Sequence, residues 1–216
     1  MERQRSPERL VFFSDAVVAI ALTLLVLPLT ELVPELIAAG KPATEAVTGN
    51  WPKIFSFLLS FAVIGRFWFT HHRIFEHVRA FNGPLVVVNF CWLLTIAVLP
   101  FPTQLIGAYQ SQRFTVLFYL GTLLAGSLCH TALLFIVRRD PAVHGDAEPV
   151  SAQWTRSFVV STGIFALAVV VACIRPGFGY YVLLLLALQP LITRRRGGDR
   201  KSDEDGRDEH QQTATG

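Results

Sequence analysis

The sequence has little charge and little cysteine. Of its 216 residues, 16% are Asp, Glu, Lys or Arg and 52% are hydrophobic. Because soluble domains carry about 25% charged residues, this balance favours a polytopic membrane protein. The three cysteines, Cys91, Cys129 and Cys173, all lie in apolar runs. Their odd number and wide spacing argue against a disulfide framework, and we interpret them as small hydrophobic residues.

Patterns typical of enzymes and metal sites are also missing. The sequence has no glycine-rich phosphate loop, no Ser-x-x-Lys motif and no paired-carboxylate arrangement. His71 and His72 are adjacent, so on a helix their rings project about 100° apart. No Cys or His follows at a ligand spacing nearby. We therefore expect no enzymatic activity, no cofactor and no metal site.

Long apolar runs make up most of the chain. A membrane-spanning helix needs about 20 mostly apolar residues, and six segments meet this requirement. They lie at about 10–30, 53–77, 84–108, 114–137, 154–174 and 177–193. The sequence thus predicts an all-α fold with six transmembrane helices in one domain, residues 1–194.

The distribution of positive charge predicts how these helices are oriented. With a cytoplasmic N-terminus, 14 Lys and Arg residues fall in cytoplasmic segments and 4 on the opposite side. The positive-inside rule therefore predicts a multi-pass protein of the cell membrane with both termini in the cytoplasm. Arg66 remains inside the second span, where it either snorkels or pairs with an acid. The first external loop contains Glu31, Glu35 and Glu45, which either enrich cations near an entrance or are simply solvated.

The C-terminal residues differ in composition from the rest of the chain. Residues 195–216 are densely charged and poor in hydrophobic residues, which predicts a disordered cytoplasmic tail. The Arg194–Arg196 run, where the last span meets this tail, is typical of a topology anchor that touches anionic membrane lipids. Acidic residues follow at once, so we expect no nucleic-acid partner.

Several polar residues fall at a similar predicted depth within the first three spans. An ionisable group in a span is costly unless it is paired, so Asp15 needs partners. We predict a network of Asp15 with Ser14, one of His71 and His72, and Asn89, near the end that also carries Trp68. Three roles remain open for this network: structural hydrogen bonding between helices, a proton relay, or an ion ligand.

The first span also carries a narrow apolar line. Phe13, Val17, Ile20, Leu24 and Leu27 lie on one line of an ideal helix, with Thr23 about 60° from Ile20 and Asp15 about 140° away. Such a line normally packs or faces lipid. In a pore, however, bulky apolar rings can block the path by dewetting. The spacing alone does not decide between these readings.

The first span reads "RLVFFSDAVVAIALTLLVL" and resembles the signature of the transmembrane protein 175 family, which includes the lysosomal potassium channel and its prokaryotic relatives. Arg9, Phe13, Ser14 and Asp15 match the family pattern R-x-x-x-F-S-D. The segments "FWFTHHRIF" and "NFCWLLTIAVLPFPT" also resemble family segments, so the likeness extends through about Gly107. The last three spans are similar only in number and hydropathy.

The resemblance implies a potassium-permeable cation channel in which four chains assemble around the first helix. It implies a hydrophobic constriction of Ile20, Leu24 and Leu27, with Thr23 as the adjacent polar layer. The resemblance also implies a structural polar network, whose members are Arg9, Ser14, Asp15, Trp68, His71 or His72, and Asn89. One chain has a single copy of the pore motif, so conduction requires a homotetramer.

Two other functions are considered beside this passive channel for monovalent cations. A proton-coupled secondary transporter would use Asp15 with His71 or His72 as proton carriers. Transporters often contain two similar halves, and the last three spans have no second "FSD" motif. A non-transporting scaffold would instead use the charged tail to recruit partners.

Overall fold

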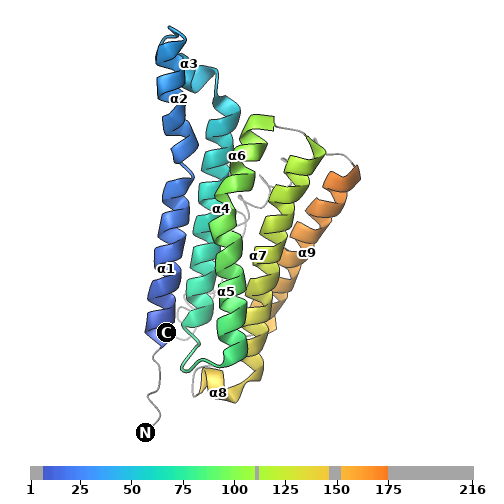
Figure 1. The fold of residues 1–216 in the computed structure, drawn as a ribbon. Helices are drawn as coiled ribbons and strands as arrows, with labels where there is room; N and C mark the ends of the chain where they lie inside the picture. The colour runs from blue at the N-terminus through green and yellow to red at the C-terminus, as the bar shows by residue number, and fades with distance from the viewer. Residues whose placement is uncertain (1–6, 110–111, 146–151, 175–216) are drawn as a thin grey trace, which may run out of the picture. The chain divides into compact units, whose positions relative to one another are not determined.

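The computed structural model describes residues 7–109, 112–145 and 152–174, and within these ranges it is helical with no strand. Figure 1 shows the order of the elements. They are α1 (Pro7–Leu24), α2 (Leu27–Ala38), α3 (Glu45–Thr48), α4 (Trp51–Phe75), α5 (Gly83–Val98), α6 (Pro100–Tyr109), α7 (Arg113–Arg139), α8 (Pro141–His144) and α9 (Ala152–Ile174).

Five stretches of the described chain are long and apolar enough to cross a membrane. They are Pro7–Ala38, Trp51–Phe75, Gly83–Tyr109, Arg113–Arg139 and Trp154–Ile174. These five stretches coincide with the first five predicted spans, which supports a multi-pass membrane protein. The predicted sixth span, 177–193, and the predicted tail, 195–216, lie outside the described residues.

The first span is broken, whereas the sequence predicted one helix through residue 30. Pro28 has no N–H to donate to the carbonyl of Leu24, so the α-helical ladder cannot continue there. The backbone tightens instead, and Val26 N–H donates to Thr23 at 3.3 Å. The helix restarts at Leu27 with Pro28 in its first turn, where a missing N–H costs nothing. Leu27 therefore belongs to α2 and not to the helix that carries Ile20.

The third span has a similar break. Pro100 and Pro102 both lack a donor, and the cap residue Leu99 shares its N–H between Thr95 and Ile96, at 3.2 Å each. The chain then continues as α6, so α5 and α6 together make one stretch of membrane length. Proline also stands in the first turn of α4, α5 and α8, as expected for a residue that begins helices well.

The helices pack around α4, α5, α6 and α7. The first helix, α1, packs against α4 and α5, while α9 packs along α7. The interior contains fully buried apolar side chains such as Ile64, Leu120 and Leu123. At Gly126 of α7, a Cβ atom would lie 2.8 Å from the Phe67 ring of α4, so only glycine permits this close approach.

Candidate functional site

One face of α1 is buried against the rest of the chain. Its residues are Ser14, Val18 and Ala21, followed by Leu25 in the break, and they recur every three or four positions. This spacing places them on one side of a helix, and that side contacts α4 and α5. Packing of this face therefore fixes which other residues of α1 point outward.

A second face of α1, about 110° around the helix from the buried one, is apolar and exposed. Ile20 is 59% exposed, Leu24 43% and Leu27 49%, although Leu27 lies beyond the break. Phe12 and Phe13 extend the exposed surface toward the start of the helix. No described part of the chain covers this face, so lipid or another subunit would have to do so.

Thr23 is the polar residue on this exposed surface. Its hydroxyl donates to the Ile20 carbonyl at 2.7 Å, on its own helix. This bond uses the hydroxyl hydrogen, so the lone pairs of the Thr23 oxygen remain available as acceptors. Thr23 thus keeps an exposed hydroxyl oxygen that can still accept a hydrogen bond.

A directed chain of hydrogen bonds connects α1, α5 and α4. Ser14 Oγ donates to the Leu10 carbonyl at 2.8 Å, so it must accept from Asn89 Nδ2, which lies 3.1 Å away. The Asn89 amide then presents its oxygen to His71 Nε2 at 2.7 Å. His71 must therefore donate from Nε2. Ser14, Asn89 and His71 are completely buried.

Asp15 belongs to a separate contact. Its Oδ1 atom accepts a hydrogen bond of 2.7 Å from the indole N–H of Trp68 on α4. The ring of the exposed His72 lies 5.8 Å from that of Trp68, and Arg9 is exposed on α1. Within the described residues, neither His72 nor Arg9 forms a hydrogen bond or an ion pair. The predicted network thus comprises two sets, Ser14–Asn89–His71 and Asp15–Trp68.

Sequence reasoning missed a second buried histidine beside the first. The His71 ring stacks on Trp92 at 4.2 Å between centroids, and Trp92 lies 5.0 Å from His130 of α7. Three buried nitrogens here, His71 Nδ1, Trp92 Nε1 and His130 Nε2, have no hydrogen-bond partner among the described residues. A histidine in the middle of the predicted fourth span was the available signal, since such groups are rarely placed in membrane helices without a role.

Hydroxyl side chains connect the remaining helices, and this too was not predicted. Ser60 of α4 contacts Thr103 of α6 at 2.8 Å and Tyr119 of α7 at 3.0 Å. On the other side of α7, Ser127 lies 2.7 Å from Thr162 of α9. Hydroxyl pairs of this kind join helices in membranes.

Arg66 reaches α9. It is half-buried, and its guanidinium donates to the Ser161 hydroxyl at 3.5 Å. An arginine inside a span must find polar partners, and hydroxyls on neighbouring helices can provide them. Its position on α4 directs it away from α1, toward the α9 side of the bundle.

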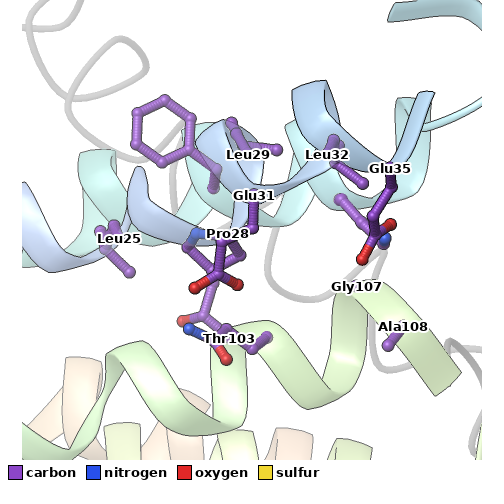
Figure 2. A pocket seen from close by; sticks show the side chains of 12 residues that line it. Leu25, Pro28, Leu29, Glu31, Leu32, Glu35, Thr103, Gly107 and Ala108 are labelled. Carbon is purple, nitrogen blue, oxygen red and sulfur yellow. The ribbon is translucent and has the colours of Figure 1, made fainter. Parts of the chain in front are cut away.

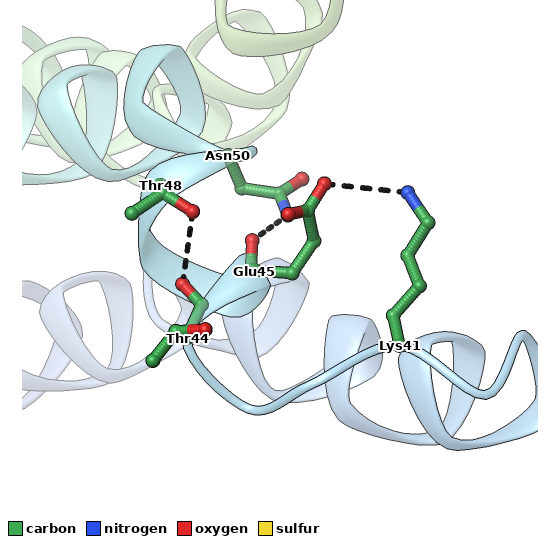
Figure 3. Close-up of polar contacts among 5 residues, drawn as sticks. All are labelled: Lys41, Thr44, Glu45, Thr48 and Asn50. Atoms are coloured by element: carbon green, nitrogen blue, oxygen red, sulfur yellow. Dashed lines mark hydrogen bonds and ion pairs between the residues drawn. The ribbon is translucent and has the colours of Figure 1, made fainter.

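Glu31 and Glu35, predicted to lie in the first external loop, instead lie on α2, at the far end of the bundle from α8, and a small cavity adjoins them. The cavity has a volume of about 180 Å³ and lies between α2, α4 and α6. In Figure 2 the carboxylates of Glu31 and Glu35 point from α2 toward α6. Glu45 instead pairs with Lys41 at 3.3 Å, on the surface, as Figure 3 shows.

Comparison with known proteins identifies the family. Residues 9–100 match the family described as endosomal/lysosomal potassium channel TMEM175. Potassium channel B446_29190 of Streptomyces collinus is 31% identical over 148 residues, which cover 64% of this chain and 70% of that protein. Potassium channel Cha6605_3372 of Chamaesiphon minutus is 30% identical over 192 residues, which cover 86% of this chain and 93% of that protein.

The chain belongs to the TMEM175 family. A crystal structure of a lysosomal potassium-selective channel TMEM175 homolog from Chamaesiphon minutus is also similar, with a TM-score of 0.72 and 27% identity. The similarity covers 87% of this chain and 97% of that one. The TMEM175 family is a family of ion channels and not of enzymes, and the names of these relatives do not favour the transporter alternative.

Proposed function

We propose that this TMEM175 chain is a potassium-permeable channel that assembles as a homotetramer around α1. The observation that carries the proposal is the exposed apolar face of α1, in a chain whose relatives are named potassium channels. Four copies of α1 around an axis would cover this face and enclose a path for monovalent cations. The described part of one chain contains α1 only once, so a ring of such helices requires further copies of the chain.

In this proposal the side chains of Ile20, Leu24 and Leu27 narrow the path. Rings of aliphatic groups expel water from a narrow pore, which closes it to hydrated ions without a charged plug. Small rotations or outward movements of α1 would widen the rings and admit ions. Thr23 would offer hydroxyl oxygens next to the Ile20 ring, where an ion has lost part of its water.

The buried polar contacts have a structural role in the proposal. Four identical helices make a regular ring only if each keeps a fixed rotation about its own axis. Ser14–Asn89–His71 and Asp15–Trp68 hold α1 on α4 and α5, with Asp15 directed away from the proposed axis. Interhelical hydrogen bonds in membrane proteins contribute about 0.6 kcal/mol each on average.

The orientation proposed from the sequence has both termini in the cytoplasm of a cell-membrane channel. The described helices support part of this pattern, because Arg73, Arg138 and Arg139 all stand in last turns at one end of the bundle. The cavity beside Glu31 and Glu35 would then lie near the outer mouth. The transporter alternative requires Asp15 or a histidine to carry protons, but Asp15 and His71 are engaged in fixed contacts between helices.

Ion flux from liposomes tests the proposal. Purified protein is reconstituted into vesicles loaded with potassium or sodium, and its size is measured in detergent. We expect a tetramer with passive flux that favours potassium. Leu24→Ala should widen the path and reduce this preference, whereas Leu167→Ala is the control, because Leu167 is also an exposed leucine but lies on α9. Identical flux from both variants and the parent would rule out the pore assignment.

A further inference from the structure

Basic and aromatic side chains meet at the α8 end of the bundle. There the guanidinium carbon of Arg73, in the last turn of α4, lies 5.7 Å from the centre of the Trp154 ring at the start of α9. The ring of His77 lies 5.4 Å from the same indole. Arg138, in the last turn of α7, donates to Thr155 Oγ1 at 2.9 Å. Two helices, α4 and α7, therefore each bring an arginine to the start of α9.

Packing against the buried core fixes the position of the Trp154 ring. Trp154 and Phe158 pack against the buried apolar cluster that joins α4, α5, α7 and α8, and their rings meet edge to face at 5.3 Å. The Trp154 ring is therefore held in place by packing, and it holds the Arg73 guanidinium above its face by a cation–π contact. Such preorganisation lowers the entropy lost when a ligand binds.

The guanidinium groups keep free donors. The guanidinium of Arg73 lies over the Trp154 indole, and it makes no hydrogen bond to a described residue. Arg138 uses one nitrogen for Thr155 and keeps its others. Both side chains are exposed. Each guanidinium can therefore bind two oxygens of a phosphate group bidentately.

Charge at this end favours an anion. The described residues at this end include six arginines and three carboxylates, so positive charge is in excess: Arg9, Arg73, Arg79, Arg138, Arg139 and Arg156, against Glu8, Glu76 and Asp140. The carboxylate of Asp140 is occupied by Asn82 and by the Ala142 N–H. Within the described residues, the one ion pair joins Lys41 and Glu45 at the opposite end. The cations beside Trp154 are therefore not neutralised by the described part of the chain.

We propose that Arg73, Arg138 and Trp154 form a binding site for the phosphate headgroup of an anionic phospholipid. Helix ends lie at the level of lipid headgroups in a membrane, and tryptophan prefers this level because its ring is apolar and its N–H is polar. A lipid that bridges α4 and α9 would act on the helix that also carries Trp68 and His71. This site is separate from the pore and does not depend on ion conduction.

Lipid binding to the purified full-length protein tests the site directly. Native mass spectrometry in detergent measures the dissociation constant for phosphatidylglycerol, with phosphatidylcholine as the neutral reference. We expect tighter binding of phosphatidylglycerol. Arg73→Gln and Arg138→Gln should each weaken it about fivefold, since a cation near the headgroups contributes about 1 kcal/mol. Lys41→Gln, which removes an exposed cation at the opposite end, should leave it unchanged.

Two milder variants keep the proposal testable if a glutamine variant does not fold. Arg73→Lys retains charge but loses the planar fork, so binding should fall between that of the parent and that of Arg73→Gln. Trp154→Phe should weaken binding about twofold through a poorer cation–π contact. Equal binding of the two lipids, an equal loss in Lys41→Gln, or displacement of the lipid by inorganic phosphate alone would overturn the assignment. Loss of potassium flux would not bear on it.

Discussion

The directed hydrogen-bond chain makes a sharp prediction for Asn89. Replacement by leucine keeps a similar volume but removes both of its side-chain hydrogen bonds. Ser14 loses the hydrogen bond that it accepts from Asn89 but still donates to the Leu10 carbonyl, so the free-energy cost at Ser14 is small. The His71 Nε2–H loses its acceptor inside a completely buried environment. The cost therefore falls mainly on His71.

The loss of stability can be estimated from the two broken hydrogen bonds, one to Ser14 and one to His71. An unsatisfied buried donor costs about 1–3 kcal/mol, and the lost bond to Ser14 adds about 0.6 kcal/mol. We expect Asn89→Leu to lower the free energy of unfolding by about 2–3 kcal/mol. Ser14→Ala leaves the buried Asn89 Nδ2–H without its acceptor, so it too should cost about 1–3 kcal/mol.

A double substitution separates the cost of leaving the buried His71 N–H without an acceptor from the cost of altered packing. If the His71 donor carries the cost, adding His71→Phe to Asn89→Leu should recover about 1 kcal/mol, because both partners are then apolar. Reversible unfolding in detergent–denaturant mixtures measures each variant, with tetramer content followed by size-exclusion chromatography. No measurable loss of stability in Ser14→Ala, or purely additive costs in the double variant, would refute the directed chain.

Three further predictions concern single positions. Gly126→Ala should destabilise the fold by about 1–3 kcal/mol because its Cβ would lie 2.8 Å from Phe67, whereas Gly121→Ala, with nothing within 4 Å, should be neutral or stabilising in the same unfolding assay. Trp92→Phe should cost under about 1.5 kcal/mol in that assay, because the ring stack remains and the indole N–H has no described partner. Asp15→Ala should reduce the tetramer yield in chromatography without changing the potassium-to-sodium flux ratio of the tetramers that remain; an unchanged yield with altered selectivity would contradict its structural role.

The sequence was sufficient for the features that depend on hydropathy and helical spacing. Apolar length located the first five spans, because lipid thickness sets helix length directly. Depth along each predicted helix placed Ser14, His71 and Asn89 near one another, and in the structure hydrogen bonds join all three. Depth could not separate Asp15 from that set, because the partner of Asp15 depends on the rotation of α4 and not on its length.

The break in the first span was harder to anticipate, because apolar composition continues through it. Pro28 lies only a few residues inside the predicted end of the span, where a proline can equally begin a loop. Whether Pro28 begins a loop or a new helix depends on whether the next helical turn packs against the rest of the chain. In α2 it does, since Leu32 is buried. That burial comes from tertiary contacts, which composition does not report. Leu27 consequently does not continue the ideal line through Ile20 and Leu24, although it remains exposed.

The buried and the exposed faces of α1 carry side chains of different size, and this difference bears on how the proposed pore could work. Ser14, Val18 and Ala21 are small or medium-sized, so α4 and α5 can approach closely and their hydrogen bonds can reach α1. Ile20 and Leu24 are larger and have no partner within the described chain. A substitution on the small face should therefore alter assembly first, and one on the large face should alter conduction first. A variant of Ala21 that changed ion selectivity in intact tetramers would show that the two faces are not independent.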